Sequence, residues 1–415
     1  MSIGGARDGL IISNHIVIAA GPDSGNYLGL DETNGSTIYQ YSTKPPSYCP
    51  MGNTVVQSSY PAVSGDLLFA EIDQASGTNC GYGLNPPQWS PALGADYLNN
   101  QPGYYVPIDA PNGESALYGY GLVAAAEGHV FFSGFRTNHL ETFIASSGEQ
   151  VWDTTTPGVV DTIPTFGDGE ILIGYSDVAN VSAVSTSGEV LWNVALSSSV
   201  LSTPSYSNGV FYFGTNGGTL YAVNGSGSIL WSKNISSPIE STPAISDGRV
   251  FFGADDGYLY ALNSADGSLI WRVALGGEVE ASPAISSNQM IYIGSTSGMF
   301  YGIDATTGRV AWQMNLWSPI TSSTALDNGY AFVADSSGVI HAIVDASAIT
   351  TTSSTSMTTS PITTSSTSQS TTSASQTNGN SSPGGAFPSL WIELTFFLLA
   401  LLFVATALFA KATTS

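Results

Sequence analysis

Positive charge is scarce in this chain. Its 415 residues include only 8 Lys and Arg against 31 Asp and Glu, so the net charge at pH 7 is −23. Nucleic-acid binding requires clustered cations that neutralise phosphates, and so few basic residues cannot form such a cluster. The sequence therefore excludes DNA and RNA as partners, and its abundance of Gly, Tyr and Phe favours a β-rich protein of the cell exterior.

Cysteine is nearly absent as well. The two cysteines, Cys49 and Cys80, both fall in an irregular N-terminal region. An even number outside the cytosol permits a disulfide between them. Two unpaired thiols are the alternative, because spacing along the chain does not fix the Cα separation that a bridge requires.

Apolar runs long enough to cross a membrane are absent except for one. Residues 390–410 read LWIELTFFLLALLFVATALFA, and a helix rising about 1.5 Å per residue crosses a hydrocarbon core of about 30 Å over this length. We expect a single transmembrane helix here, with Trp391 and Lys411 at the two interfaces and a short cytoplasmic tail over 411–415. A buried core helix and a cleaved C-terminal sorting tail are the alternatives.

Charge is missing altogether from residues 347–389, which are dominated by Ser and Thr. Such a segment cannot bury a core, so we expect a disordered stalk between a folded part and the membrane. Export would make five sequons available for N-glycosylation, although Asn-Gly-Ser also occurs in turns for conformational reasons. These sequons are at Asn34, Asn180, Asn224, Asn234 and Asn380.

The N-terminus has no apolar signal core over residues 1–9. A propeller that faces outward must be exported, and export normally requires a signal peptide. We therefore expect the native chain to begin upstream, with a signal peptide and a strand that completes the last repeat. A cytosolic protein inserted by its tail is the alternative, and there the sequons and the disulfide would have no role.

Tryptophan recurs about every 40 residues in the middle of the chain, at Trp152, Trp192, Trp231, Trp271 and Trp312. Each unit divides into four short apolar strands with turn signals between them, such as Asp247-Gly248 and Asp266-Gly267. The pattern predicts an all-β fold, a β-propeller of four-stranded antiparallel blades over residues 1–346. Eight units can be placed, which predicts an eight-bladed ring, with a seven-bladed ring as the alternative. The second unit carries an insertion over about 73–120, and the eighth lacks its outer strand.

The segment GIDATTGRVAW, from Gly302 to Trp312, resembles the tryptophan-docking motif of the PQQ-like propeller repeat. That family includes the quinoprotein dehydrogenases and the non-enzymatic propeller of the bacterial outer-membrane assembly machinery. The resemblance covers roughly residues 8–346 and is looser before Thr162, where Tyr39 stands in the Trp position. It implies that the five repeat tryptophans lock neighbouring blades together and take no part in an active site.

The resemblance also raises the question of pyrroloquinoline quinone (PQQ), whose three carboxylates need cationic partners. The cations are instead scattered over repeat positions, at Arg136, Arg249, Arg272, Arg309 and Lys233. The vicinal disulfide and the calcium site of the dehydrogenases have no counterpart, and no hydrolase, phosphate-loop or metal motif is present. His341 fills a position held by Tyr260 and Tyr301 in sister units, which favours a structural role. We therefore expect no catalytic residue, no metal site and no cofactor.

Aromatic residues in the insertion and in one link do not fit the repeat. The candidates for ligand contact are Trp89, Tyr82, Tyr97, Tyr104 and Tyr105, together with Trp317 between the seventh and eighth units. Exposed aromatics on a rigid scaffold are a common means of binding, whereas packing of the insertion onto the ring is the alternative.

The sequence thus predicts a non-enzymatic cell-surface propeller, single-pass and facing outward, that binds or scaffolds cell-surface or secreted proteins or glycans. A PQQ-dependent or related oxidoreductase and a structural component of the cell envelope are the alternatives.

Overall fold

The computed structural model describes residues 10–20, 26–42, 62–64, 67–75, 89–97, 101–107, 122–133 and 138–344. Every regular element within these ranges is a β-strand. The described residues hold no helix long and apolar enough to span a membrane. The predicted stalk, transmembrane helix and tail lie outside the described residues.

The described strands form seven four-stranded sheets and one three-stranded sheet, numbered here from first to eighth in chain order. The first three sheets contain β1 (Ile11–Ser13), β2 (Ile16–Ala20), β3 (Asn26–Asp31), β4 (Thr37–Ser42), β5 (Ala62–Ser64), β6 (Leu67–Ala75), β7 (Trp89–Tyr97), β8 (Gln101–Pro107), β9 (Leu122–Ala126), β10 (His129–Ser133), β11 (His139–Ile144) and β12 (Gln150–Thr155).

The fourth to eighth sheets follow the same plan. They contain β13 (Thr165–Gly167), β14 (Glu170–Gly174), β15 (Asn180–Ser185), β16 (Val190–Ala195), β17 (Ser205–Ser207), β18 (Val210–Gly214), β19 (Thr219–Asn224), β20 (Ile229–Asn234), β21 (Ala244–Ser246), β22 (Arg249–Gly253), β23 (Tyr258–Asn263), β24 (Leu269–Ala274), β25 (Ala284–Ile285), β26 (Met290–Gly294), β27 (Met299–Asp304), β28 (Val310–Asn315), β29 (Ala325–Asp327), β30 (Tyr330–Ala334) and β31 (Ile340–Val344).

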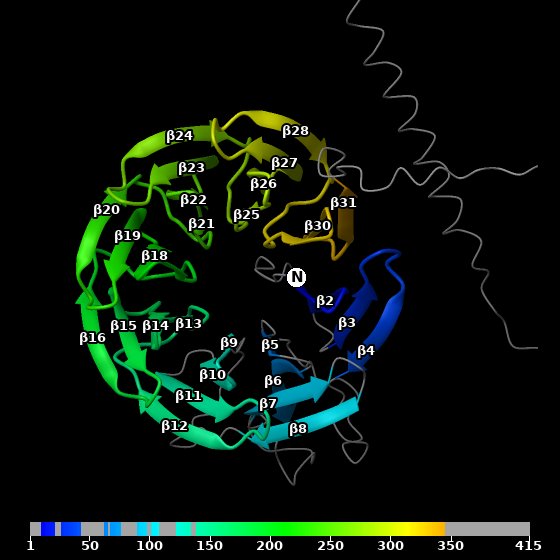
Figure 1. Ribbon diagram of the computed structural model, residues 1–415, viewed down its shortest axis with the longest axis vertical. Helices are drawn as coiled ribbons and strands as arrows, with labels where there is room; N and C mark the ends of the chain where they lie inside the picture. Colours follow the sequence, from blue (N-terminus) through cyan, green and yellow to red (C-terminus); the bar gives the residue numbers. More distant parts are fainter. Residues whose placement is uncertain are drawn as a thin grey trace, which may run out of the picture. The chain divides into compact units, whose positions relative to one another are not determined.

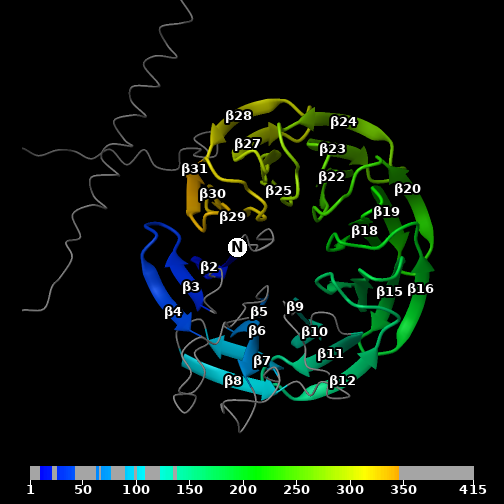
Figure 2. The same ribbon diagram turned by 180° about the vertical axis from the view of Figure 1, so that it is seen from behind.

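Within the compact unit Met1–Thr352, the sheets follow one another around a common centre (Figures 1 and 2). The first strand of each sheet lies innermost and the fourth outermost. Strands are antiparallel and sequential throughout, as in the sixth sheet, where Phe252 pairs with Tyr260. Strand β1 also contacts β29, so the first and eighth sheets are neighbours. The prediction of an all-β propeller is confirmed.

The hydrophobic core is divided among the interfaces between neighbouring sheets. Phe251 and Leu259 of the sixth sheet, for example, share one cluster with Ile291 and Ile293 of the seventh, and all four side chains are fully buried. The two central strands of a blade are almost wholly buried, because both of their faces pack on adjacent sheets. Each such side chain contributes about 1.5–3 kcal/mol, so cohesion between blades comes from these repeated apolar contacts.

Two-residue turns join the first and second strands in six of the described sheets, whereas four residues separate β25 from β26 in the seventh. Asp247 and Gly248 have φ values of 47° and 71°, the left-handed pair that a type I′ hairpin needs. This confirms the hairpin predicted from Asp-Gly. Strands β7 and β8 of the second sheet fall inside the range 73–120 that the sequence marks as an insertion, so part of that range belongs to the blade itself.

Candidate binding surface

The repeat tryptophans of the outer strands join each sheet to the next. The indole Nε1–H donates to a backbone carbonyl in the turn between the third and fourth strands of the following sheet. The bonds are Trp152 to Thr186 (2.8 Å), Trp192 to Gly225 (2.8 Å), Trp231 to Ser264 (2.8 Å) and Trp271 to Ala305 (3.2 Å). These four indoles therefore connect each sheet to the next one.

The turn that receives each indole contains a glycine because the ring lies directly against its Cα. A Cβ at Gly267 would lie 2.6 Å from Cε3 of Trp231, and one at Gly308 would lie 2.6 Å from Cδ2 of Trp271. Both glycines also have positive φ, 68° and 71°. The Thr-Gly and Asp-Gly of the repeat motif therefore serve both the turn and the docking of the neighbouring indole.

The indole of Trp312 has no such hydrogen bond to a following sheet among the described residues, and Tyr39 takes the Trp position in the first sheet. Trp312 pairs in backbone register with Gly302 and packs on the rings of Phe300 and Tyr292 in its own sheet. The backbone of Tyr39 pairs with Gly29 at the same bulged register. Tyr39 therefore occupies the Trp position of the first sheet in the backbone, as its alignment in the sequence predicts.

The aromatic candidates of the second unit lie on strands where they are described. Trp89 begins β7, Tyr97 ends it, and Tyr104 and Tyr105 belong to β8. Tyr82 lies outside the described residues, as do Cys49, Cys80 and Asn380. The other sequons are at Asn34 in the exposed β3–β4 turn, at Asn180 and Asn224 in half-buried strand positions, and at exposed Asn234.

Trp317 is the most exposed large apolar side chain among the described residues, with 86% of its surface accessible. Its φ is 70°, and its backbone N–H donates to Oδ1 of Asn315 at 2.7 Å. The equivalent residue of the sixth-to-seventh link is Gly276, whose φ is 77°. A left-handed backbone is unfavourable for a bulky residue. Glycine would be less strained than tryptophan at this position. The exposed indole adds little packing in return.

The link that carries Trp317 is held rigidly on both sides. The preceding Leu316 donates to the carbonyl of Gly298 at 2.8 Å, just as Leu275 donates to Gly257 in the sixth sheet. On the other side, Ser336 of the eighth sheet donates to the carbonyl of Pro319 at 2.8 Å. The exposed indole is therefore presented by a fixed backbone.

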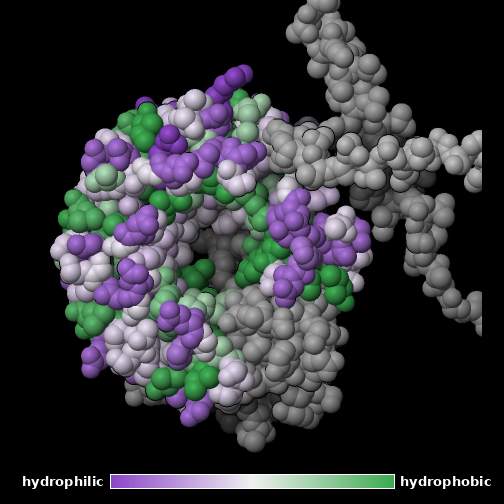
Figure 3. All heavy atoms as spheres, in the orientation of Figure 1, coloured by the Kyte–Doolittle hydropathy of each residue, from purple (hydrophilic) through white to green (hydrophobic). Residues whose placement is uncertain are grey.

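Six other exposed apolar residues lie on the outer strands, in pairs just before the docking tryptophans. They are Val190 with Leu191, Ile229 with Leu230, and Leu269 with Ile270. Figure 3 shows apolar patches along the rim that are separated by hydrophilic residues. Small separate patches of this kind are ordinary on protein surfaces, so they do not mark a binding site.

His341 occupies the place of Tyr260, as the sequence predicts for a structural residue. Its Nε2 lies 2.7 Å from Oδ2 of Asp335, and the hydroxyl of Tyr260 donates to Oδ2 of Asp256 at 2.5 Å. Burial raises the pKa of Tyr260 to about 12, and the bond to Asp256 adds to this effect. Tyr260 therefore stays protonated at neutral pH.

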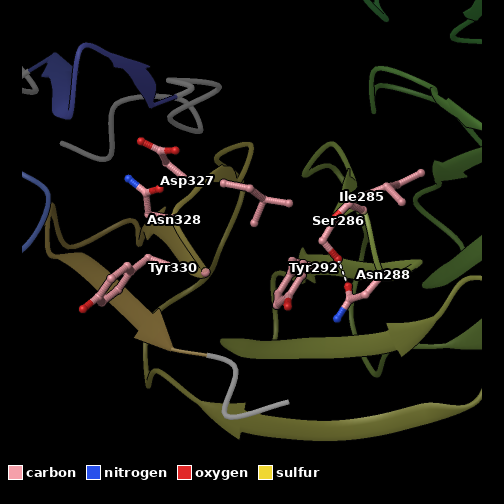
Figure 4. A pocket seen from close by; sticks show the side chains of 10 residues that line it. Ile285, Ser286, Asn288, Tyr292, Asp327, Asn328 and Tyr330 are labelled. Atoms are coloured by element: carbon pink, nitrogen blue, oxygen red, sulfur yellow. Dashed lines mark hydrogen bonds between the residues drawn. The ribbon is translucent and has the colours of Figure 1, made fainter. Parts of the chain in front are cut away.

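A cavity of about 470 Å³ lies between the β25–β26 and β29–β30 turns. Figure 4 shows Asn288 and Tyr292 on one side and Asp327, Asn328 and Tyr330 on the other. Its lining includes no Lys or Arg, so it offers no cation to the three carboxylates of PQQ. Of the described cations, Arg272 instead lies 4.6 Å above the ring of Tyr258. The described residues that line this cavity therefore do not fit this cofactor.

Within the described ranges, metal-ligating side chains converge at one place, where His15, Glu32 and Asp327 meet across the first and eighth sheets. No sequence motif predicts this group, because its members are far apart in the chain. The one available signal is in the first hairpin turn, Asn14-His15, which lacks the glycine of its sister turns.

The family model described as "Outer membrane protein assembly factor BamB" matches residues 136–238 and 218–379, together more than half of the chain. The chain belongs to this family of PQQ-like β-propeller repeat proteins. No curated protein matches the sequence significantly.

Solved structures agree with the BamB-like assignment at the level of the fold. The crystal structure of BamB from Moraxella catarrhalis has a TM-score of 0.60 at 18% identity, and the match covers 82% of this chain and 94% of that one. The computationally designed Ika8 protein has a TM-score of 0.62 at 15% identity, covering 83% and 98%. At identities this low, the similarity shows a shared fold and nothing further.

Proposed function

We propose that this BamB-like propeller is a non-enzymatic scaffold that binds another protein through the surface around Trp317. The observation that carries the proposal is the strained and 86% exposed indole at this position. Buried tryptophans dominate the binding energy of many protein interfaces. A rigid link also lowers the entropy that is lost on binding. Membership in a family named for an assembly factor favours a protein partner over a glycan or a redox substrate.

We place this surface outside the cell. The apolar segment 390–410 serves as a membrane anchor, and the uncharged segment 347–389 serves as a spacer that keeps the propeller away from the bilayer. The partner is then another protein of the cell surface or of the surrounding medium. A net charge of −23 makes a partner with a basic contact surface the most favourable.

The test compares the wild-type protein with Trp317→Ala in affinity capture from native membranes. We expect a specific set of proteins to be retained by the wild type and to be lost or reduced at least tenfold with the variant. Leu230→Ala is the matched control, because Leu230 is 51% exposed but lies on the rim. Trp89→Ala tests the aromatic candidates of the second unit in the same way.

Equal capture by the wild type and Trp317→Ala would contradict the proposal. Loss of capture with Trp89→Ala alone would move the binding surface to the second unit. Binding to purified surface polysaccharide, with no protein retained, would replace the protein partner by a glycan.

A further inference from the structure

The hairpin turn of the first sheet differs from the other described two-residue turns, because it has no glycine at its second position. Its residues Asn14 and His15 have φ values of 50° and 63°. The second position of this turn is glycine in the other described two-residue turns: Gly128, Gly169, Gly209, Gly248 and Gly329. A histidine with positive φ is strained, and such strain is often retained where the side chain has a role.

The imidazole of His15 meets two carboxylates that come from opposite ends of the chain. Its Nδ1 lies 2.7 Å from Oε1 of Glu32, just after β3, and 3.7 Å from Oδ2 of Asp327, at the end of β29. Asn328 donates from Nδ2 to the same Oε1 at 2.7 Å. Four side chains thus hold the first sheet against the eighth.

Glu32 is the buried member of the group. Its side chain is 5% exposed, and its second oxygen, Oε2, has no hydrogen-bond partner among the described residues. A buried carboxylate oxygen without a partner is costly. The carboxylate of Asp327 is a second acidic group close by, because the ligand atoms of His15, Glu32 and Asp327 all lie within 4.8 Å of one another. Two carboxylates facing each other in this way favour a cation between them.

We propose that His15, Glu32 and Asp327 together bind one divalent transition-metal ion, with Zn²⁺ the first candidate, which ties the first sheet to the eighth. Imidazole with two carboxylates is a ligand set that suits Zn²⁺ and disfavours Mg²⁺ and Ca²⁺. Tetrahedral Zn²⁺ ligands lie about 3.3 Å apart, since each bond is about 2.0–2.2 Å. The observed separations of 2.7 and 3.7 Å from His15 Nδ1 bracket this value.

The surroundings of the three ligands suit the role. The His15 side chain is 72% exposed, so an ion can enter from solvent and keep a water molecule as fourth ligand. An ion at this position would take the place of the direct contact between His15 Nδ1 and Glu32 Oε1. Asn328 is a positioning residue, because its amide fixes Oε1 of Glu32. The ion would close the ring between segments about 300 residues apart, where loop closure is entropically costly.

Isothermal titration of the full protein with ZnCl₂, after treatment with a chelator, tests the proposal. We expect one ion per chain and a thermal midpoint that rises with the logarithm of the Zn²⁺ concentration. His15→Gly restores the residue of the sister turns, so it should fold as well as the wild type without metal. We expect it to bind Zn²⁺ at least 100-fold more weakly, and Glu32→Gln to do the same.

His139→Gln is the matched control. His139 also pairs with a carboxylate, Asp153, at 2.9 Å, but no third ligand joins them among the described residues. This variant should bind Zn²⁺ as the wild type does. The proposal fails if the wild type binds no stoichiometric Zn²⁺, if His15→Gly binds as tightly as the wild type, or if His139→Gln abolishes the site.

Discussion

Replacing Trp231 by alanine tests whether the repeat tryptophans hold the blades together. The indole is 8% exposed, packs against Gly267 of the next sheet and donates to the carbonyl of Ser264 at 2.8 Å. Truncation of a buried tryptophan costs about 3–5 kcal/mol in unfolding free energy. Trp231→Phe keeps most of the apolar contact and loses the hydrogen bond, which costs about 1 kcal/mol. The Ser264 carbonyl also accepts from Tyr212, which limits this loss.

Urea denaturation followed by far-UV circular dichroism measures both effects without relying on indole fluorescence. The neighbouring Leu230 is 51% exposed, so Leu230→Ala should change the unfolding free energy by no more than about 0.5 kcal/mol. The reasoning is refuted if Trp231→Ala costs less than about 1 kcal/mol. It is also refuted if the phenylalanine variant is as unstable as the alanine variant, because the apolar contact would then contribute nothing.

Three further predictions concern single positions. Gly267→Ala should lower the unfolding free energy by at least about 2 kcal/mol in urea denaturation, because alanine is unfavourable in a left-handed backbone and its Cβ would clash with Trp231. A variant as stable as the wild type would contradict the docking geometry. Trp317→Gly should leave stability unchanged or raise it by up to about 1 kcal/mol, since it relieves strain and removes no packing; a large loss would show that the indole is structural. Burial acts to raise the pKa of Asp335, but hydrogen bonds with His341 and Ser337 outweigh it and hold that pKa below its ordinary value. The wild type should therefore be more stable than Asp335→Asn at pH 6, and this difference in unfolding free energy should be lost as the pH falls below about 4. A difference that grows in acid would contradict the prediction.

The repeat itself could be predicted from the sequence because it combines two signals of fixed period. The tryptophan spacing gives the blade length, and the turn glycines divide each blade into strands. Even Tyr39 could be placed, since its unit keeps the same offsets as its sisters. The docking role of the repeat tryptophans is implied by the resemblance, and four of the five donate a hydrogen bond to the next sheet.

The two sites of greatest interest were harder to predict, for different reasons. The sequence shows that Trp317 is an aromatic residue that does not fit the repeat. Its strained backbone is visible only in the φ angle of the structure. Alignment with Gly276 is the signal that could have found it. The His15 group depends on which sheet lies beside which, and contact between β1 and β29 is a property of ring closure. No local pattern relates Glu32 to Asp327.

The most direct test of the central claim is site-specific photo-crosslinking at position 317 in native membranes. A photoreactive phenylalanine analogue in place of Trp317 should give a discrete crosslink to a second protein, because this residue is held at the proposed contact. The same analogue in place of Leu230 on the rim should not. Absence of any protein crosslink at position 317, or an identical pattern at both positions, would contradict the account.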